Sequence, residues 1–416
     1  MNLYLFIAKK FACKGRERGR LGRISNVIAT ISVAISVAVV IVAIAVANGF
    51  RYKIRESATG FMGDITLSAP GADITDYLYP VQVPSYIDTL KNLKEVESVS
   101  GVAYRSGIIK SGEQIHGALF KGVDSLYNRK FYEEHLVGGQ LPDYGSDTAS
   151  NAILLSSSMA NLLGYSIGDK LFAYFVGEQV TFRIFTICGI YNAPLEEMNN
   201  KIIVADIDLI RSVNGWEENR LSGYEIVLKK RYGSDNAAAA AEIERVIMEQ
   251  TPSDDSFALL PSTVEERFYI LYDWLRLLDI NVVILLLLMT AVAGFNMVSG
   301  ALIMLFERIP QIGLFKALGM RDKNIAKIFL YRSSFILLKG LVAGNLIALL
   351  FCYLEWKYRF IPLDAGNYFV NHVPIYIEWR QVIVADIAAF LLIMTILLVP
   401  CRTISRISPA RTLVVR

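Results

Sequence analysis

The sequence predicts an α-helical membrane protein with four transmembrane helices and a large α+β extracytoplasmic domain, made of two subdomains, between helices 1 and 2. Three observations support this fold class. Four stretches are long and apolar, 54% of the 416 residues are hydrophobic against 19% charged, and the charges are distributed unevenly along the chain. A soluble surface would need roughly 25% charged residues. Part of the apolar content must therefore lie outside water.

The four predicted spans differ in how completely they exclude charge. Residues 27–47 and 280–306 carry no charged side chain, and residues 333–354 and 381–401 carry one each. An α-helix rises about 1.5 Å per residue, so about 20 residues cross a hydrocarbon core of ~30 Å. The alternative is a buried helix of a soluble protein, but 27 uncharged residues exceed what globular cores use. Because no cleavage-site pattern follows the first span, we expect it to remain as an anchor.

The distribution of charge predicts the topology. Residues 1–26 (an amphipathic N-terminal segment), 307–332 and 402–416 together carry 17 Lys and Arg against 3 Asp and Glu. Residues 48–279 carry 21 against 32. The positive-inside rule therefore places both termini and the loop 307–332 in the cytoplasm, with 48–279 and 355–380 outside. The net charge of +3 also excludes a strongly basic nucleic-acid-binding protein.

The outer segment is predicted to contain two subdomains and a stalk. Residues 61–104 and 216–261 each show a strand–helix–strand pattern, which predicts a flanking α/β subdomain. The inserted residues 105–215 are rich in strand signals, so a mostly β subdomain is expected there. Apolar residues spaced by three and four predict a stalk helix at 262–279 that continues into the second span. A similar continuation is expected for residues 48–60 after the first span.

The sequence lacks the motifs of common enzymes and metal proteins. The three histidines are far apart, the four cysteines form no CxxC pair, and neither GxSxG nor GxxxxGK[ST] occurs. We therefore expect a non-catalytic chain with no metal and no cofactor of its own.

Two charged residues lie inside the predicted spans. Lys339 is near the cytoplasmic end of the third span and Asp386 near the outer end of the fourth. Their different depths make a direct pair improbable, and snorkelling of both side chains is the simplest interpretation. A proton relay is the alternative.

The loop 307–332 is more than a plain connector. Pro310 can begin a helix and Gly319 can end it. The apolar residues between them lie beside Lys316 and are expected to be exposed; they are Ile312, Leu314, Phe315 and Leu318. Such a helix is suited to dock into a groove of a cytoplasmic partner. A helix lying on the lipid surface is the alternative.

This loop resembles that of LolC/LolE-type permeases in the MacB/FtsX-like (type VII) ABC transporter superfamily. The shared pattern R-x-x-x-IG-x-x-KALG-x-x-x-x-x-I-x-x-IF runs from Arg308 to Phe329. FNMVSGALIMLFER at 295–308, GDITL at 63–67 and the closing ISRISPARTLVVR at 404–416 are similar to the same family. The resemblance covers nearly the whole chain.

The resemblance implies a permease that releases lipoproteins from the bacterial inner membrane by mechanotransmission. Two permeases, identical or paralogous, would pair with a LolD-like ABC ATPase dimer, which would bind the ATP and Mg. The chain would contact membrane lipids and a lipoprotein substrate, which it would pass to a LolA-like periplasmic carrier. The large domain would then be periplasmic.

The resemblance also implies two sets of contact residues. The helix at 309–320 would be a coupling helix seated on the ATPase, and its contact set is Arg308, Gln311, Ile312, Leu314, Phe315, Lys316, Leu318, Gly319 and Met320. Acyl chains would enter between the first two spans, where the candidate lipid or lipoprotein contacts are Val42, Val46, Phe50, Phe268, Leu271, Tyr272 and Leu275. Ordinary helix–helix or lipid packing is the alternative for each residue of the second set.

One feature departs from the LolC pattern. LolC has a protruding hook between two outer-domain strands that captures the carrier, whereas residues 176–180 here suffice only for a tight connection. Either the chain is LolE-like in role, or a carrier docks elsewhere, or the chain does not release lipoproteins. The other functions left open are a MacB-like efflux permease without a fused ATPase, an FtsX-like regulator of a cell-wall hydrolase, and a receptor without an ATPase.

Overall fold

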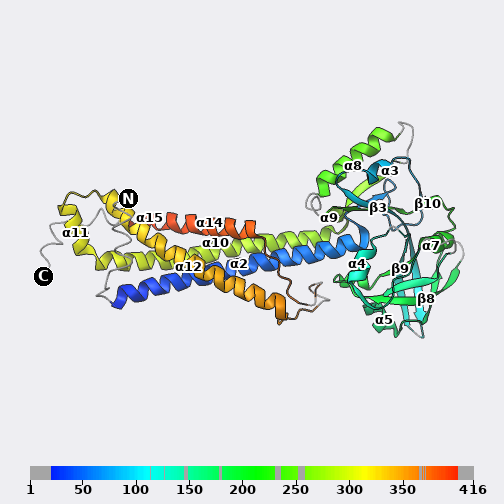
Figure 1. Cartoon of the computed structure of the whole chain (residues 1–416), viewed down its shortest axis with the longest axis horizontal. Coiled ribbons are helices and arrows are strands. Elements are labelled where there is room, and N and C mark those ends of the chain that lie inside the picture. Colours follow the sequence, from blue (N-terminus) through cyan, green and yellow to red (C-terminus); the bar gives the residue numbers. More distant parts are fainter. Residues whose placement is uncertain are drawn as a thin grey trace. The chain divides into compact units, whose positions relative to one another are not determined.

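The chain folds into two compact units (Figure 1). The computed structural model describes residues 20–112, 114–125, 127–144, 149–177, 180–229, 236–251, 258–364, 368, 370 and 372–401. The membrane unit comprises Met1–Arg51, Trp274–Pro362 and Val373–Arg416, and the sheet unit comprises Tyr52–Asp273 and Leu363–His372. The predicted amphipathic N-terminal segment, up to residue 19, and the family-like tail at 404–416 lie outside the described residues.

Within the described residues, four helices are long and apolar enough to cross a membrane. They are α2 (Arg20–Met62), α10 (Tyr269–Glu307), α12 (Asp322–Tyr358) and α14 (Trp379–Ile396), which the short α15 (Leu398–Cys401) follows. Each predicted span lies within one of these helices or, at the end of the chain, within α14 and α15. The expected helical continuation through residues 48–60 is present, because α2 ends only at Met62.

The predicted stalk at 262–279 is helical with one interruption. Residues 262–263 belong to strand β12 (Leu260–Thr263), and α9 (Val264–Arg267) begins directly after it. The Thr263 hydroxyl accepts the Glu266 backbone N–H, and the Glu266 carboxylate accepts the Thr263 N–H, so a capping box fixes the start of α9. Phe268 then separates α9 from α10.

Small residues on α12 allow close packing against α2 within the membrane unit. A Cβ on Gly340 would lie 2.6 Å from Val33 Cγ1, and a Cβ on Gly344 would lie 2.6 Å from the Ala34 carbonyl oxygen. Ala348 continues the same spacing of four and is fully buried. Small residues at this spacing let two helix backbones approach closely in lipid, where packing rather than water exclusion stabilises helix pairs.

We expect Gly344→Ala to destabilise the membrane unit by about 1–3 kcal/mol, since the Ala34 backbone has no side-chain freedom with which to yield. Thermal unfolding of the detergent-purified chain measures the loss. Val342→Ala is the matched control, because Val342 is exposed on the same helix. Equal melting temperatures for the wild type and Gly344→Ala would contradict this packing.

The sheet unit is built on a ten-stranded sheet with the order β12-β1-β11-β3-β4-β9-β6-β8-β5, while β7 pairs with β3 and β8. The remaining strands of this sheet are β1 (Ile65–Ser68), β3 (Val96–Ser111), β4 (Gln114–Val123), β5 (Leu136–Gly139), β6 (Ala152–Ser156), β7 (Lys170–Phe175), β8 (Thr181–Tyr191), β9 (Ile202–Asp206) and β11 (Gly223–Leu228). A second, two-stranded sheet pairs β2 (Val81–Gln82) with β10 (Arg220–Leu221).

The two predicted subdomains share this sheet instead of forming separate ones. The reason is β3, which is 16 residues long. It pairs with β11 from Val96 to Val102 and with β4 from Val102 to Ser111. The first half of β3 thus belongs to the predicted flanking subdomain and the second half to the predicted insertion.

Short helices cover the sheet. They are α3 (Ile87–Lys91), α4 (Arg129–Glu134), α5 (Ser157–Leu163), α6 (Glu196–Asn199), α7 (Ile207–Asn214) and α8 (Asn236–Gln250). The main core contains residues from both predicted subdomains, including Ile65, Ile187 and Ile243. A second core of aromatic residues surrounds Phe61, in the last turn of α2.

Candidate coupling helix and buried polar joint

A short helix, α11 (Ile309–Ala317), occupies the loop between α10 and α12. Pro310 stands in its first turn, where the missing N–H costs nothing. After the helix, Gly319 adopts a φ of +84°, which is unfavourable for other residues and lets the chain reverse into α12. Lys316 Nζ lies 2.9 Å from Asp322 Oδ1 at the start of α12. The predicted helix is therefore present and begins where expected, but it ends at Ala317, three residues before the predicted end at 320, and an ion pair links it to α12.

The apolar residues of α11 divide into an inner and an outer group. Ile312 is only 1% exposed and packs with Leu305 and Ile325, so it fixes α11 to α10 and α12. The expectation that Ile312 is exposed was wrong, because the two flanking helices cover that side of α11. Leu314 is 51% exposed and Leu318 is 75% exposed. These two leucines form the apolar surface that the loop presents.

The other predicted coupling residues lie around these two leucines. Arg308 Nη1 donates a hydrogen bond to Gln311 Oε1 at 2.9 Å. Together with Phe315, these two residues line a shallow groove of about 20 Å³ between α11 and α12. Exposure varies across the rest of the set: Gln311 and Gly319 are exposed, and Arg308, Phe315, Lys316 and Met320 are half-buried.

The predicted lipid contacts are mostly packed within the chain. Phe50 is buried, and its ring meets that of Trp274 edge-on at 5.8 Å between centroids. Leu275 is also buried. The half-buried members are Val42, Val46, Phe268, Leu271 and Tyr272. In this conformation, helix packing accounts for Phe50 and Leu275, and the role of the set in lipid binding stays a prediction.

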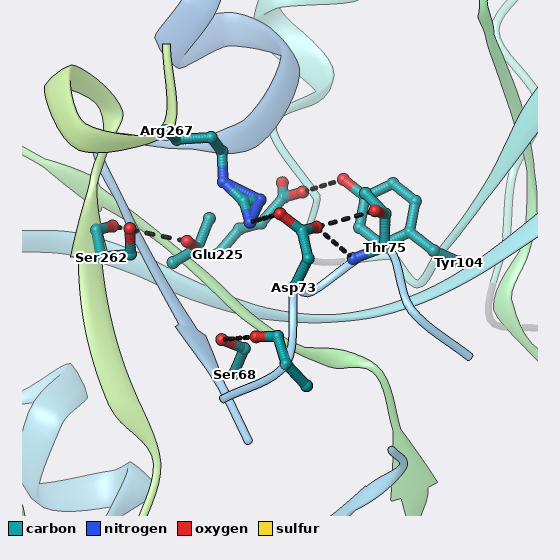
Figure 2. Close-up of polar contacts among 9 residues, drawn as sticks. Ser68, Asp73, Thr75, Tyr104, Glu225, Ser262 and Arg267 are labelled. Atoms are coloured by element: carbon teal, nitrogen blue, oxygen red, sulfur yellow. Dashed lines mark hydrogen bonds and ion pairs between the residues drawn. The ribbon is translucent and has the colours of Figure 1, made fainter. Parts of the chain in front are cut away.

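A buried ion pair lies where α2 enters the sheet unit. Lys121 Nζ on β4 lies 2.7 Å from Glu225 Oε2 on β11 and donates a second hydrogen bond to the Phe61 carbonyl oxygen of α2. The Tyr104 hydroxyl on β3 donates to Glu225 Oε1 at 2.6 Å, a contact visible in Figure 2. All three side chains are buried. Burial and the neighbouring Glu225 charge hold the pKa of Tyr104 well above its usual value, so the phenol remains a donor.

A second ion pair lies beside the first, where the chain leaves the sheet unit through α9. Arg267 Nη2 lies 3.0 Å from Asp73 Oδ2 (Figure 2). The backbone N–H and the hydroxyl of Thr75 donate to the same carboxylate at 2.8 and 2.7 Å. Burial acts to raise the pKa of Asp73, but the Thr75 hydrogen bonds and Arg267 outweigh it and hold that pKa below its usual value.

These contacts form a polar joint, defined here as Phe61, Asp73, Tyr104, Lys121, Glu225 and Arg267. It ties the last turn of α2 to strands β3, β4 and β11, and it ties α9 to Asp73 in the loop between β1 and β2. A displacement of the last turn of α2 inside the sheet unit must therefore move these strands or break buried polar contacts, which is costly.

The polar joint could not be predicted from the sequence, because its members are distant along the chain. Tyr104 and Glu225, for example, are 121 positions apart. The one available signal was Lys121, a lysine in a strand whose neighbours are apolar, since lysine is almost never buried unless it is paired.

Another titratable group, Asp64, lies in the loop after α2 and makes the stability of the folded chain depend on pH. Its Oδ2 accepts the Leu228 backbone N–H at 2.9 Å. Burial raises the pKa of this carboxyl from 3.8 to about 6, although the Leu228 hydrogen bond and Arg55 oppose the shift. The folded protein therefore binds this proton more tightly than the unfolded chain does, so stability falls as pH rises from about 4 to about 6.

We expect Asp64→Asn to remove this pH dependence, because the amide oxygen can still accept the Leu228 N–H but does not ionise. Above about pH 6 the variant should be more stable than the wild type by up to roughly 3 kcal/mol. Chemical unfolding of the full chain across a pH series measures the difference. If the free energies of unfolding of the two proteins changed with pH in parallel, Asp64 would not be the group that causes the pH dependence.

The described residues combine four apolar helices with a large sheet unit between the first two and a short helix between the second and third. This architecture and the matching family models place the chain in the class of membrane-spanning ABC transporter permeases. The chain belongs to the family with a MacB-like periplasmic core domain, whose model matches residues 27–246. The model described as FtsX-like permease C-terminal matches residues 283–409. These matches confirm the resemblance found in the sequence.

Individual relatives show similarity along nearly the whole chain at low identity. The lipoprotein-releasing system transmembrane protein LolC of Xylella fastidiosa is 22% identical, with 96% of each chain covered. The corresponding LolE of Haemophilus influenzae is 20% identical, with 99% of each covered. An uncharacterised ABC transporter permease of Methanocaldococcus jannaschii is 23% identical over 79% of this chain and 80% of its own.

Proposed function

We propose that this chain is a permease subunit that releases lipoproteins from the inner membrane to a periplasmic carrier, driven by a separate ATPase. The observation that carries this proposal is its similarity, over nearly the full length of both chains, to proteins named for lipoprotein release. In this proposal, the chain is a non-catalytic subunit with no cofactor of its own, and ATP and Mg bind the partner ATPase dimer.

The ATPase is proposed to seat on α11. Leu314 and Leu318 would enter an apolar groove of the partner, while Arg308 and Lys316 would meet its acidic groups. Because Ile312 is buried against α10 and α12, and Lys316 is paired with Asp322, α11 cannot move without moving both spans. This arrangement supports mechanotransmission from the ATPase to the membrane helices.

The topology proposed for this function places both termini and α11 in the cytoplasm and the sheet unit in the periplasm, as the charge distribution favours. The partners are a LolD-like ATPase dimer, a second permease, membrane lipids, a lipoprotein and a LolA-like carrier. The polar joint would carry helix motion into the sheet that faces the lipoprotein.

The connection between β7 and β8 bears on carrier docking. The two strands pair up to Phe175 and Thr181, which leaves residues 176–180 to join them, and residues 178 and 179 lie outside the described residues. So short a connection supports a LolE-like role beside a paralogous, hook-bearing partner.

A MacB-like efflux permease without a fused ATPase is the second candidate, favoured by the match of the MacB-like core model to residues 27–246. Depletion of the chain in its native host, followed by fractionation of triacylated lipoproteins, separates the two. Lipoprotein release predicts that these lipoproteins accumulate in the inner membrane. If they still leave it normally while export of small molecules falls, the efflux function replaces the first proposal.

A further inference from the structure

A cavity lies within the membrane unit between α2, α10 and α14. It is small and partly open, with a volume of about 10 Å³, and it is lined mainly by apolar side chains. Three polar residues also line it, one from each helix: Ser36 on α2, Thr290 on α10 and Asp386 on α14. Ser36 and Thr290 are both buried. Serine and threonine are common at helix interfaces in membranes, whereas an ionisable residue such as Asp386 inside a span is rare and is a common mark of function.

A fourth helix holds the carboxyl group of Asp386 in place. Asn345 Nδ2 on α12 donates to Asp386 Oδ2 at 3.0 Å and to the Leu341 carbonyl oxygen of its own helix at 2.9 Å. The second bond fixes the orientation of the amide. Asn345 therefore acts as a positioning residue for Asp386, and the expectation that Asp386 simply snorkels to the headgroups does not describe this contact.

Among the described residues, Asp386 forms no ion pair with a lysine, an arginine or a histidine. The sequence of α2 has no charged residue from 24 to 50, and that of α10 has none from 280 to 306. On α12, Lys339 is exposed and is six residues before Asn345, about 9 Å along the helix. Glu355, also on α12, is ten residues beyond Asn345, about 15 Å away, and like Asp386 it is acidic. On α14 itself, Arg380 is six residues from Asp386 in the first turn of the helix.

Asp386 is half-buried within the chain, and the rest of its side chain would face the apolar surroundings of a membrane span. An unpaired carboxylate there carries a large desolvation cost, whereas a neutral carboxyl group carries little. The neutral group needs an acceptor for its O–H as well as the Asn345 donor. The Ser36 and Thr290 hydroxyls line the same cavity, whose volume of about 10 Å³ is close to the minimum for one water molecule. Through such a water they can accept that hydrogen bond.

We propose that Asp386, Ser36 and Thr290 form a proton-binding site inside the membrane unit, with Asn345 positioning the carboxyl group. The ligand is a single proton, exchanged at Asp386. Loss of the proton leaves a negative charge facing the cavity, which draws in water and weakens the packing of α14 against α2 and α10. Proton occupancy thus biases the arrangement of these three helices, a property that goes beyond lipoprotein release and does not depend on it.

The test uses dicyclohexylcarbodiimide, an apolar reagent that modifies protonated carboxyl groups in apolar surroundings. The full-length chain in membrane vesicles is treated across a pH series, and modified peptides are mapped by mass spectrometry. We expect Asp386 to be modified at neutral pH and its labelling to fall several-fold at alkaline pH. Asp322, a cytoplasmic carboxylate paired with Lys316, should stay unmodified and serves as the internal control.

Two variants sharpen the result. Asn345→Ala removes the N–H that stabilises the ionised form, so labelling of Asp386 should persist to more alkaline pH than in the wild type. Ser36→Ala combined with Thr290→Val removes the hydroxyl acceptors at little change in volume, so labelling should decline at a lower pH. Infrared spectra of the wild type and of the isosteric Asp386→Asn variant give an independent readout, because the protonated-carboxyl band should be lost in the variant.

The proposal is overturned if Asp386 is unmodified at every pH, if its labelling does not vary with pH or shift in the variants, or if the infrared band is unchanged in Asp386→Asn. A failure of lipoprotein release leaves each of these readouts unaffected, so the two proposals fail separately.

Discussion

Leu318→Asp should abolish co-purification of the partner ATPase while leaving the permease folded. Leu318 is 75% exposed in the chain, so the substitution disturbs none of its internal packing. In the docked complex, however, a carboxylate would replace an apolar contact and become desolvated without a partner. A cost of about 3 kcal/mol or more corresponds to a roughly 100-fold weaker complex.

The matched comparison lies on the same helix. Ile312→Ala removes a side chain that packs against Leu305 and Ile325, so it should lower the stability of the permease itself by about 2–5 kcal/mol. Affinity purification together with a melting curve separates the two effects. Wild-type recovery of the ATPase with Leu318→Asp would mean that α11 does not dock through its exposed leucines.

Lys121→Met should destabilise the sheet unit by about 3–5 kcal/mol, because it leaves Glu225 buried without its cation and removes a donor from the Phe61 carbonyl oxygen. A calorimetric scan of the full chain would show the loss as a lowered melting temperature. Lys91→Met is the matched control, since Lys91 forms an exposed pair with Asp88 and should change stability by less than about 1 kcal/mol.

The double variant Lys121→Met with Glu225→Leu distinguishes stability from coupling. Replacing both charges with apolar side chains should restore much of the stability lost in the single variant. It should not restore transport, if motion of α2 reaches the sheet through the Lys121 contact to Phe61. Full transport by a stable double variant would show that the polar joint has only a structural role.

The features that the sequence predicted correctly depend on local information. The spans follow from uncharged length, and the boundaries of α11 follow from Pro310 and Gly319, whose backbone preferences act wherever they stand. The buried position of Ile312 could not be predicted in the same way, because it depends on where α10 and α12 lie in space.

The need to know how elements lie in space also explains two other features that the sequence did not predict, the shared sheet and the polar joint. The shared sheet results from one long strand, β3, that changes neighbours at Val102, and strand signals do not reveal the partners of a strand. The polar joint depends on β3, β4 and β11 lying side by side. Tyr104, Lys121 and Glu225 become a cluster only through that pairing, so no motif marks them.

The most direct test of the central claim is ATP-dependent release of a triacylated lipoprotein from proteoliposomes that contain this permease, its ATPase and its partner permease. The proposed function predicts that ATP transfers the lipoprotein to a soluble carrier, and that Leu318→Asp prevents both ATPase binding and transfer. Steady ATP hydrolysis by the assembled wild-type complex with all of the lipoprotein still in the membrane would contradict it.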